Sequence, residues 1–320
     1  MIQTRPLSHP AAHALLHVTV LVWGFTAILG RSISIGAAPL VFYRLVIVVI
    51  AMGALALWRR VRWTLSARTG LALVGAGVLV ALHWMLFYGC IKVSGVAVAV
   101  LCLSSNTFFT AWLEPLVFRR AVDPRELLVG VVVVLGVSLL VRFETPATPL
   151  GLAMGLGSAL FSAAFGTLNG RLVHGTRAEL VTLVELGTAL VVTGSFFVVR
   201  PGDFVPPGAL SLRDLALLLA LGIGCTVLPW LWSLRVLKTL SPYTVALAVA
   251  LEPVYSIALA WVLFGGAERL GTRFYLGAGA LVLLVLGNGW LRRPRGGAGG
   301  GTSLTAEARP GRERAEGPSR

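Results

Sequence analysis

Apolar stretches of about twenty residues recur along the whole chain, separated by short segments that hold most of the charged side chains. An α-helix of this length crosses the ~30 Å hydrocarbon layer of a membrane and satisfies its own backbone hydrogen bonds there. Charged residues make up 12% of the chain, against about 25% in soluble domains. The pattern predicts an all-α polytopic membrane protein with ten transmembrane helices, near residues 14–34, 38–58, 70–90, 94–118, 127–142, 150–171, 179–199, 214–234, 241–264 and 274–291.

The distribution of Arg and Lys predicts how these helices are oriented. Ten spans place both termini on one side of the membrane. Of the 27 Arg and Lys residues, 19 fall on that side, 7 fall on the other, and Arg44 lies inside a span. The positive-inside rule then places both termini in the cytoplasm, with the protein in the plasma (inner) membrane. This distribution also accounts for the net charge of +14 without nucleic-acid binding.

The two ends of the chain contrast with the spans. Residues 1–13 are expected to form a cytoplasmic N-terminus without a cleavable signal, because the first apolar run is long enough to span. Residues 292–320 are rich in Gly, Arg and Glu and have almost nothing to bury, which predicts a disordered basic tail. Attraction to anionic lipid and control of topology are its expected roles.

Small residues within the spans indicate packing rather than chemistry. Cys90, Cys102 and Cys225 all lie in apolar stretches and lack the spacing of a disulfide framework or a metal site. The Gly, Ala and Ser residues of 151–170 indicate closely packed helices. We expect neither a metal nor a cofactor.

An internal repeat divides the spans into halves, residues 14–142 and 150–291. "GFTAILGRS" (24–32) resembles "AFGTLNGRL" (164–172) at an offset of 140, and "LLVGVVVVLG" (127–136) corresponds to "FYLGAGALVL" (274–283) at an offset of 147. Each half has five spans, an odd number, so the second half is expected to be inverted in the membrane. Inverted repeats are typical of secondary transporters, whose substrate sites lie near the midplane.

The tripeptide Leu-Glu-Pro occurs twice, and the repeat separates the two copies. They lie nine residues out of register, so Pro253 aligns with Asn106. Glu114 falls just before a pair of arginines at the cytoplasmic end of its span, where a carboxylate could reach water or pair with an arginine. Glu252 lies in the middle of its span, so only Glu252 is predicted to be deep in the membrane.

Three stretches resemble the EamA-type members of the drug/metabolite transporter superfamily, which have ten spans in two inverted halves. They are "LVWGFTAILGRSI" (21–33), "HWMLFYGCIKVSGVAVAVLCLSS" (83–105) and residues 222–268, which hold a Leu-Ser-Pro helix start, a mid-helix proline and then Gly-Ala-Glu. The resemblance covers about residues 14–291 and implies transport of small metabolites or drugs. Asn106 stands where the family often has proline, which leaves the symmetry of the two central helices open.

Glu252 and Pro253 form the strongest candidate site. A charge at mid-span costs ~2.5–3.5 kcal/mol on insertion scales. Pro253 removes a backbone hydrogen bond and frees a carbonyl one turn earlier, a helix break that is tolerated only in a protein interior or beside a cavity. We predict that Glu252 binds a proton or a substrate amine. The alternative is a structural glutamate bonded to a neighbouring helix.

Arg44 and Glu185 lie in spans that correspond under the repeat. An arginine in one half facing a glutamate in the other could form a gate across the pseudo-symmetry axis. Alternatively, both long side chains could extend to the nearest membrane surface.

Further candidates for a cavity lining are polar or aromatic residues inside spans. His83 could relay protons or hydrogen-bond a neighbouring helix. Trp84, Trp230 and Tyr255 are candidate aromatic walls, and Asn106 would add a neutral polar group.

The leading function is that of a secondary active transporter, an exporter of small amphipathic metabolites or drugs that works by alternating access. The chain has no Gly-x4-Gly-Lys-Ser/Thr nucleotide loop, which leaves a proton or counter-substrate gradient as the driving force. A membrane-embedded lipid-modifying enzyme would need a convergent set of catalytic groups, whereas the carboxyls here lie at different depths. A channel or a non-transporting receptor is the remaining alternative. The expected partners are the substrate, the coupling ion and the lipid bilayer, and homodimerisation is left open.

Overall fold

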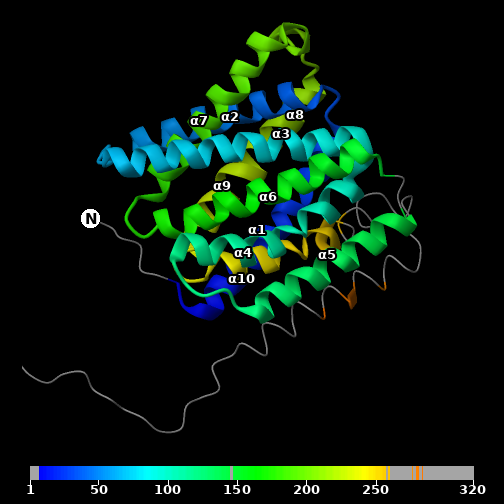
Figure 1. The fold of residues 1–320 in the computed structure, drawn as a ribbon. Coiled ribbons are helices and arrows are strands. Elements are labelled where there is room, and N and C mark those ends of the chain that lie inside the picture. Colours follow the sequence, from blue (N-terminus) through cyan, green and yellow to red (C-terminus); the bar gives the residue numbers. More distant parts are fainter. Residues whose placement is uncertain are drawn as a thin grey trace, which may run out of the picture.

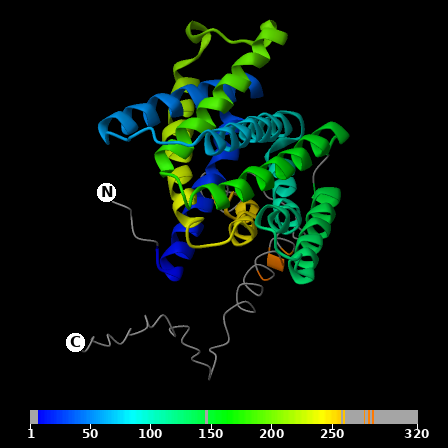
Figure 2. The same ribbon diagram turned by 60° about the vertical axis from the view of Figure 1, so that its left-hand side comes forward.

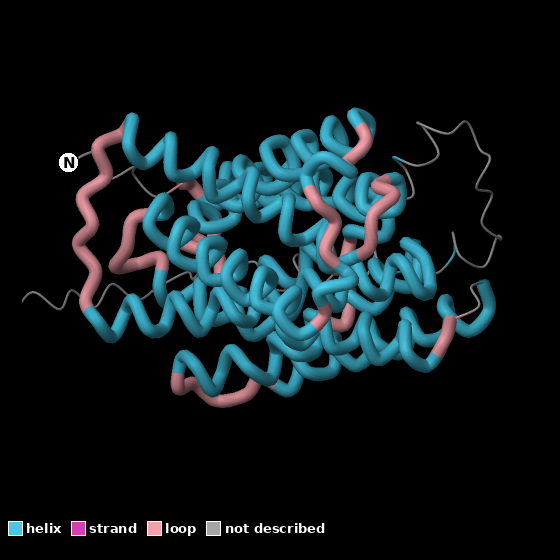
Figure 3. Tube along the Cα trace, turned by 90° about the horizontal axis from the view of Figure 1, so that it is seen from above, coloured by secondary structure: helices cyan, strands magenta, loops and turns pink. Residues whose placement is uncertain are grey.

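The computed structural model describes residues 7–144 and 147–256 and five separate positions between 259 and 283. Its regular elements are all helices, and the described residues contain no strand (Figure 3). They are α1 (His9–Ser32), α2 (Ala37–Trp58), α3 (Ala67–Leu103), α4 (Asn106–Phe118), α5 (Pro124–Glu144), α6 (Pro149–Leu172), α7 (Ala178–Val199), η1 (Pro201–Asp203), η2 (Pro207–Ala209), α8 (Leu212–Leu219), η3 (Ala220–Val227), α9 (Leu228–Val236) and α10 (Pro242–Val249).

Six helical segments in the described residues are long and apolar enough to cross a membrane. They are α1, α2, α3, α6, α7 and the continuous stretch Leu212–Val236, which joins α8, η3 and α9. The predicted all-helical membrane class is confirmed for this part of the chain. The end of the ninth predicted span with its Gly-Ala-Glu motif, most of the tenth span (274–291) and the tail (292–320) lie outside the described residues.

Helix α3 contains a sharp break at Gly95. The helix has 37 residues, so a straight rod would be about 55 Å long, nearly twice the ~30 Å hydrocarbon layer. Gly95 has φ 87°, a conformation that glycine adopts without the steric cost that a Cβ would bring. The break falls at the second residue of the predicted fourth span (94–118), close to the predicted boundary with the third span (70–90).

Hydrogen bonds join loops to one another at each of the two ends of the bundle. At one end, Arg59 after α2 donates to Glu179 at the start of α7 (3.1 Å), and Arg171 at the end of α6 donates to the carbonyl of Val117 in α4 (3.1 Å). We call this the arginine-rich end, because it holds the loops for which the sequence has the larger count of Arg.

The other end, which we call the opposite end, is joined by a separate set of bonds. The backbone N–H and hydroxyl of Ser34 both donate to Asp214 at the start of α8 (2.8 and 2.5 Å). Lys92 in α3 donates to the carbonyl of Ile33 after α1 (2.5 Å). Such bonds are expected when successive spans are antiparallel, because alternate loops then lie at the same end of the bundle.

The centre of the bundle is built around α3. It contacts α2 and α7 on one side and α6 on the other, while α5 stands at the edge beside α4 (Figures 1 and 2). The predicted close packing of 151–170 is seen at Gly155, where a Cβ would come within 2.6 Å of Cys102 Cβ in α3. Cys90, Cys102 and Cys225 are free and buried, as expected of packing residues.

The outward faces of the helices carry large apolar side chains. Leu57, Trp58 and Val198 are about four-fifths exposed, at 79%, 79% and 84%. In a soluble protein such exposure would be an association hazard, whereas lipid tails solvate it. The polar side chains discussed below are instead buried between helices.

Candidate functional site between two broken helices

Two helices are interrupted near the centre of the bundle, at positions that correspond in the repeat. A turn at Ser104 and Ser105 separates α3 from α4, and a turn at Ala250 and Leu251 separates α10 from the helical residues 252–256. The Ser104 hydroxyl donates to the carbonyl of Ala250 (3.4 Å), so the two interruptions touch although 146 residues separate them. Broken helices at this depth are typical of transporter binding sites.

Each interruption has a local cause in the sequence. In the second half, Pro253 has no N–H for the carbonyl four residues earlier. In the first half there is no proline, but the Ser104 hydroxyl also lies 3.3 Å from the carbonyl of Val100, and such back-bonding bends helices. Asn106 in place of proline therefore does not remove the symmetry of the central helices: both are broken.

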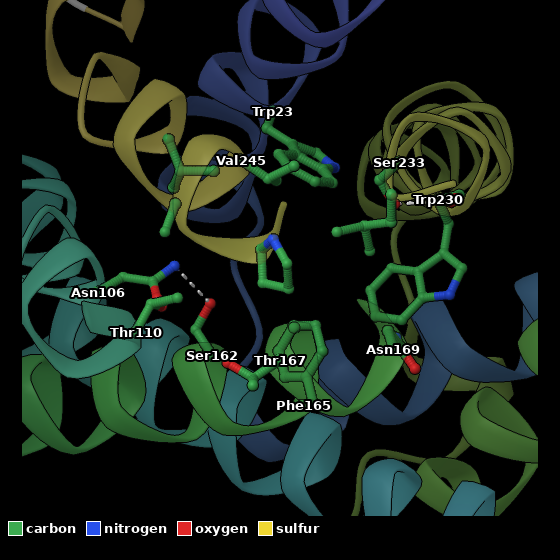
Figure 4. Close-up of a pocket in the computed structure, with 15 residues that line it drawn as sticks. Trp23, Asn106, Thr110, Ser162, Phe165, Thr167, Asn169, Trp230, Ser233 and Val245 are labelled. Atoms are coloured by element: carbon green, nitrogen blue, oxygen red, sulfur yellow. Dashed lines mark hydrogen bonds between the residues drawn. The ribbon is translucent and has the colours of Figure 1, made fainter. Parts of the chain in front are cut away.

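Two adjoining cavities of about 70 Å³ each lie beside these interruptions. The first, the Asn106 chamber (Figure 4), is lined by Trp23, Asn106, Thr110, Ser162, Phe165, Gly166, Thr167, Asn169, Trp230, Ser233, Leu237, Pro242, Val245, Ala246 and Val249. The second, the Glu252 chamber, is lined by Trp23, Thr26, Arg44, His83, Trp84, Phe87, Leu103, Ser162, Phe165, Trp230, Val249 and Glu252. The two share five of these residues, and both halves of the chain contribute walls.

The Asn106 chamber has aromatic walls and a small polar floor. The Asn106 amide donates to the Ser162 hydroxyl (3.3 Å) and accepts from the Thr110 hydroxyl (2.9 Å), which fixes the orientation of the amide (Figure 4). Trp23 and Trp230 form walls that border both chambers. This combination suits a ligand with an apolar body and few polar groups.

The Glu252 chamber holds the deep carboxyl. Glu252 is 3% exposed, and no group in the described part of the chain hydrogen-bonds its carboxyl. A buried acceptor without a protein partner is available to a proton or to a ligand donor. The alternative of a structural glutamate bonded to a neighbouring helix has no support among the described contacts.

Arg44 faces the same chamber and is held rigidly. Its Nε donates to Thr226 Oγ1 and its Nη1 donates to Tyr88 Oη, both at 2.8 Å, and the guanidinium lies 3.8 Å from the centre of the Trp84 ring. Arg44 is 3% exposed, so it does not extend to the membrane surface. A guanidinium has five N–H donors, and those outside these two bonds have no hydrogen-bond partner among the described residues, so they are available to a ligand.

The partner of Arg44 depends on a π-helical turn. Pro229 cannot donate to the carbonyl four residues earlier, and the preceding segment η3 is wound as a wider π-helix. In this segment the Thr226 hydroxyl donates five residues back to Leu221 (2.6 Å) while it accepts from Arg44. Gly222 lets α2 approach, because a Cβ there would meet Ile47 Cγ2 at 2.8 Å.

Aromatic rings join the two chambers. Trp230 stacks on Phe165 with ring centres 5.6 Å apart and meets Trp84 edge-on at the same distance. His83 lies beside Phe165 and is bonded to Ser158, with Nδ1 2.9 Å from the carbonyl and 2.8 Å from the hydroxyl. His83 therefore both borders the Glu252 chamber and bonds a neighbouring helix.

The structure brings most of the predicted residues together. One chamber collects Arg44, His83, Trp84, Trp230 and Glu252, and the adjoining one holds Asn106.

Two predicted residues lie elsewhere. Tyr255 borders neither chamber, and its hydroxyl is 2.9 Å from His17 Nδ1. Glu185 lies behind the wall of the Asn106 chamber and accepts from Asn169 (3.2 Å). Arg44 and Glu185 do not form an ion pair in the described residues, so a gate between them stays a prediction for another conformation.

The sequence reasoning missed several wall residues. Ser162 and Phe165 lie in a stretch interpreted only as packing, and Thr226 bears no sign of its bond to Arg44. The Pro229 position was the available signal for a distorted helix near this site.

Glu114 differs in part from its prediction. It pairs with Arg120 as expected (3.3 Å), but it is 5% exposed rather than open to water. Its second oxygen accepts from the backbone N–H of Tyr243 (2.7 Å), in the first turn of α10. Glu114 thus caps a helix of the other half at the arginine-rich end.

A helical membrane bundle with paired broken helices and cavities between them is an arrangement typical of membrane transporters. The model of the EamA-like transporter family matches residues 11–142 and again residues 149–289. The chain therefore belongs to the EamA-like transporter family, and its two halves are repeats of one unit. A solved structure described only as "Crystal structure of protein" shares the fold, with a TM-score of 0.68 and 16% identity over 89% of this chain and 98% of that one. No curated protein matches the chain.

Proposed function

We propose that the protein is a secondary active exporter that moves a small amphipathic metabolite or drug by alternating access. Ten helices form two inverted halves, and the chambers at their contact are the substrate path. The observation that carries the proposal is the meeting of two broken helices, at Ser104 and Ala250, beside cavities lined from both halves. Rocking of the halves about this contact would open the same site to each side in turn.

The charges in the Glu252 chamber favour a particular substrate chemistry. Arg44 offers unused N–H donors to an acid group, and Glu252 offers an acceptor to an amine or a proton. The rings of Trp23, Trp84 and Trp230 suit an apolar body between these groups. A small molecule with an acidic or zwitterionic head and an apolar or aromatic body fits this lining.

Flux measurements test the proposed function. An untargeted comparison of metabolites in cells with and without the gene identifies the candidate solute, and liposomes that contain the purified protein then measure its movement. Saturable uptake that depends on a gradient is expected. Flux that rises linearly with concentration would indicate a channel, and turnover of a lipid would indicate an enzyme.

The orientation leads to a separate prediction. With both termini in the cytoplasm, single cysteines in the 59–69 loop and in the tail should not react with an impermeant thiol reagent added to intact cells, while one in 202–210 should react. Labelling after permeabilisation shows that each cysteine is reactive. Reaction of the 59–69 loop in intact cells would reverse the orientation.

A further inference from the structure

Three neighbouring side chains at or behind the wall of the Asn106 chamber have buried polar atoms without hydrogen-bond partners among the described residues. They are Oε1 of Glu185, Oδ1 of Asn169 and Nε1 of Trp230, contributed by α7, α6 and α9. Glu185 and Asn169 are already joined, because Asn169 Nδ2 donates to Glu185 Oε2 (3.2 Å). The Trp230 indole N–H acts on the Glu185 carboxyl as a weak donor, but the geometry between them falls outside that of a hydrogen bond, so the N–H keeps its capacity to bond a water.

The chemistry of these atoms defines what fits between them. Two are oxygen acceptors and one is an N–H donor. An ammonium group could satisfy the two oxygens but not the indole. A water molecule donates twice and accepts at least once, so it can satisfy all three, and buried waters typically make about three such bonds. Asn169 and Trp230 also line the Asn106 chamber, which gives a water there a route to solvent when the chamber opens.

Within the described part of the chain, Glu185 has no charged neighbour to stabilise a carboxylate. It is 0% exposed, and none of the titratable groups on the elements around it bonds to it or acts on it electrostatically. Those groups are Tyr43 and Arg44 on α2, Arg68, His83, Tyr88, Cys90, Lys92 and Cys102 on α3, Arg171 on α6, Glu179 on α7, Asp203 on η1 and Arg235 on α9. An isolated buried carboxylate is costly, so the protonated acid is the form that this environment accommodates.

We propose that Glu185 is a second proton-binding carboxyl of the carrier, which exchanges its proton through a water held by Asn169 and Trp230 at the wall of the Asn106 chamber. When the chamber opens, that water carries the proton between Glu185 and solvent. Only the role of this proton in driving transport rests on the proposed transport function. The proton site itself can be tested without a substrate.

Infrared spectroscopy of the purified protein in bilayers tests the site. A protonated carboxyl gives a C=O band that moves to lower frequency in D₂O. We expect Glu185→Gln to remove one such band and Trp230→Phe, which keeps an aromatic ring but loses the indole N–H, to shift it. Glu179→Gln is the matched control on the same helix: Glu179 is paired with Arg59 and Arg177 and should contribute no acid band.

The possible outcomes separate this proposal from the transport function. Unchanged acid bands in Glu185→Gln at every pH would overturn the proton site, even if transport is intact. If neither Trp230→Phe nor Asn169→Leu changes the frequency of the Glu185 acid band, the bridging water would be overturned. If Glu185→Gln does not fold, Glu185→Asp is the second variant, because it keeps an acid. Its acid band should shift rather than disappear. An unshifted band would contradict the assignment to Glu185.

Discussion

Glu252→Gln is expected to abolish uptake driven by a pH gradient while substrate-for-substrate exchange survives. The carboxyl is buried in its chamber without a described hydrogen-bond partner, so it can take up a proton from one side and release it to the other. The amide keeps the shape and one acceptor but cannot titrate. Exchange need not move a proton, so that half of the cycle should remain. Purified protein in liposomes, assayed for both activities, makes the measurement.

Glu114→Gln is the matched control, because it makes the same change in the other Leu-Glu-Pro tripeptide. Its amide oxygen can still accept from the Tyr243 N–H, and only the charge pair with Arg120 is lost. This variant should transport nearly as well as the original protein. Equal losses in the two variants would show that depth in the membrane does not distinguish them. Loss of both uptake and exchange in folded Glu252→Gln would indicate direct contact with substrate.

Arg44→Gln is expected to weaken substrate binding strongly. A hydrogen bond to a charged group contributes about 1.5–3 kcal/mol, so loss of about 2 kcal/mol corresponds to roughly a 30-fold weaker affinity. Arg44→Lys keeps the charge but loses the planar guanidinium and its stacking on Trp84. Its apparent affinity for the substrate should therefore lie between those of the original protein and Arg44→Gln. The concentration dependence of uptake gives the apparent affinity, and the thermal midpoint in detergent shows whether the fold is intact.

Arg59→Gln is the control for this prediction. Its side chain is 50% exposed at the arginine-rich end, paired with Glu179 and remote from both chambers. The apparent affinity of Arg59→Gln for the substrate should equal that of the original protein. If folded Arg44→Gln binds as tightly as the original protein, Arg44 does not contact the substrate, and its bonds to Thr226 and Tyr88 only hold the helices together.

The position of a residue along its helix could be predicted from the sequence, because it follows from its place within an apolar run. Glu252 was expected to be deep and is buried at the helix break, and Glu114 was expected at a helix end beside an arginine. The helical class follows from the same runs, since a membrane span has few other solutions. The repeat aligned Pro253 with Asn106, but without a proline in the first half the symmetry of the central helices stayed open, and the turn at Ser104 was not predicted.

The direction in which each side chain points could not be predicted. In these spans apolar residues surround the whole helix, so the pattern does not distinguish the face toward lipid from the face toward a neighbour, and helix rotation is set by packing. Tyr255 lies one turn beyond Glu252 yet bonds His17 instead of lining the chamber. Glu185 corresponds to Arg44 in the repeat, but packing turns it toward Asn169.

The local helix distortion that places Thr226 beside Arg44 could not be predicted from the sequence pattern either. The π-helical η3 arises from Pro229, and a proline can equally produce a kink, a 3₁₀ turn or a break. In the structure, α2 packs closely against Gly222 of this wide turn, and Thr226 accepts from Arg44 there.

Access to Ser162 from each side of the membrane tests alternating access most directly, because Ser162 borders both chambers. In protein whose Cys90, Cys102 and Cys225 are replaced by alanine, Ser162→Cys should react with a small impermeant thiol reagent added to either side of liposomes. Ala163→Cys, next to it but buried in packing, is the control and should stay unreactive. The transported solute should slow the reaction on both sides. Reaction from one side only, or from neither, under conditions that support transport would contradict a site that opens to each side in turn.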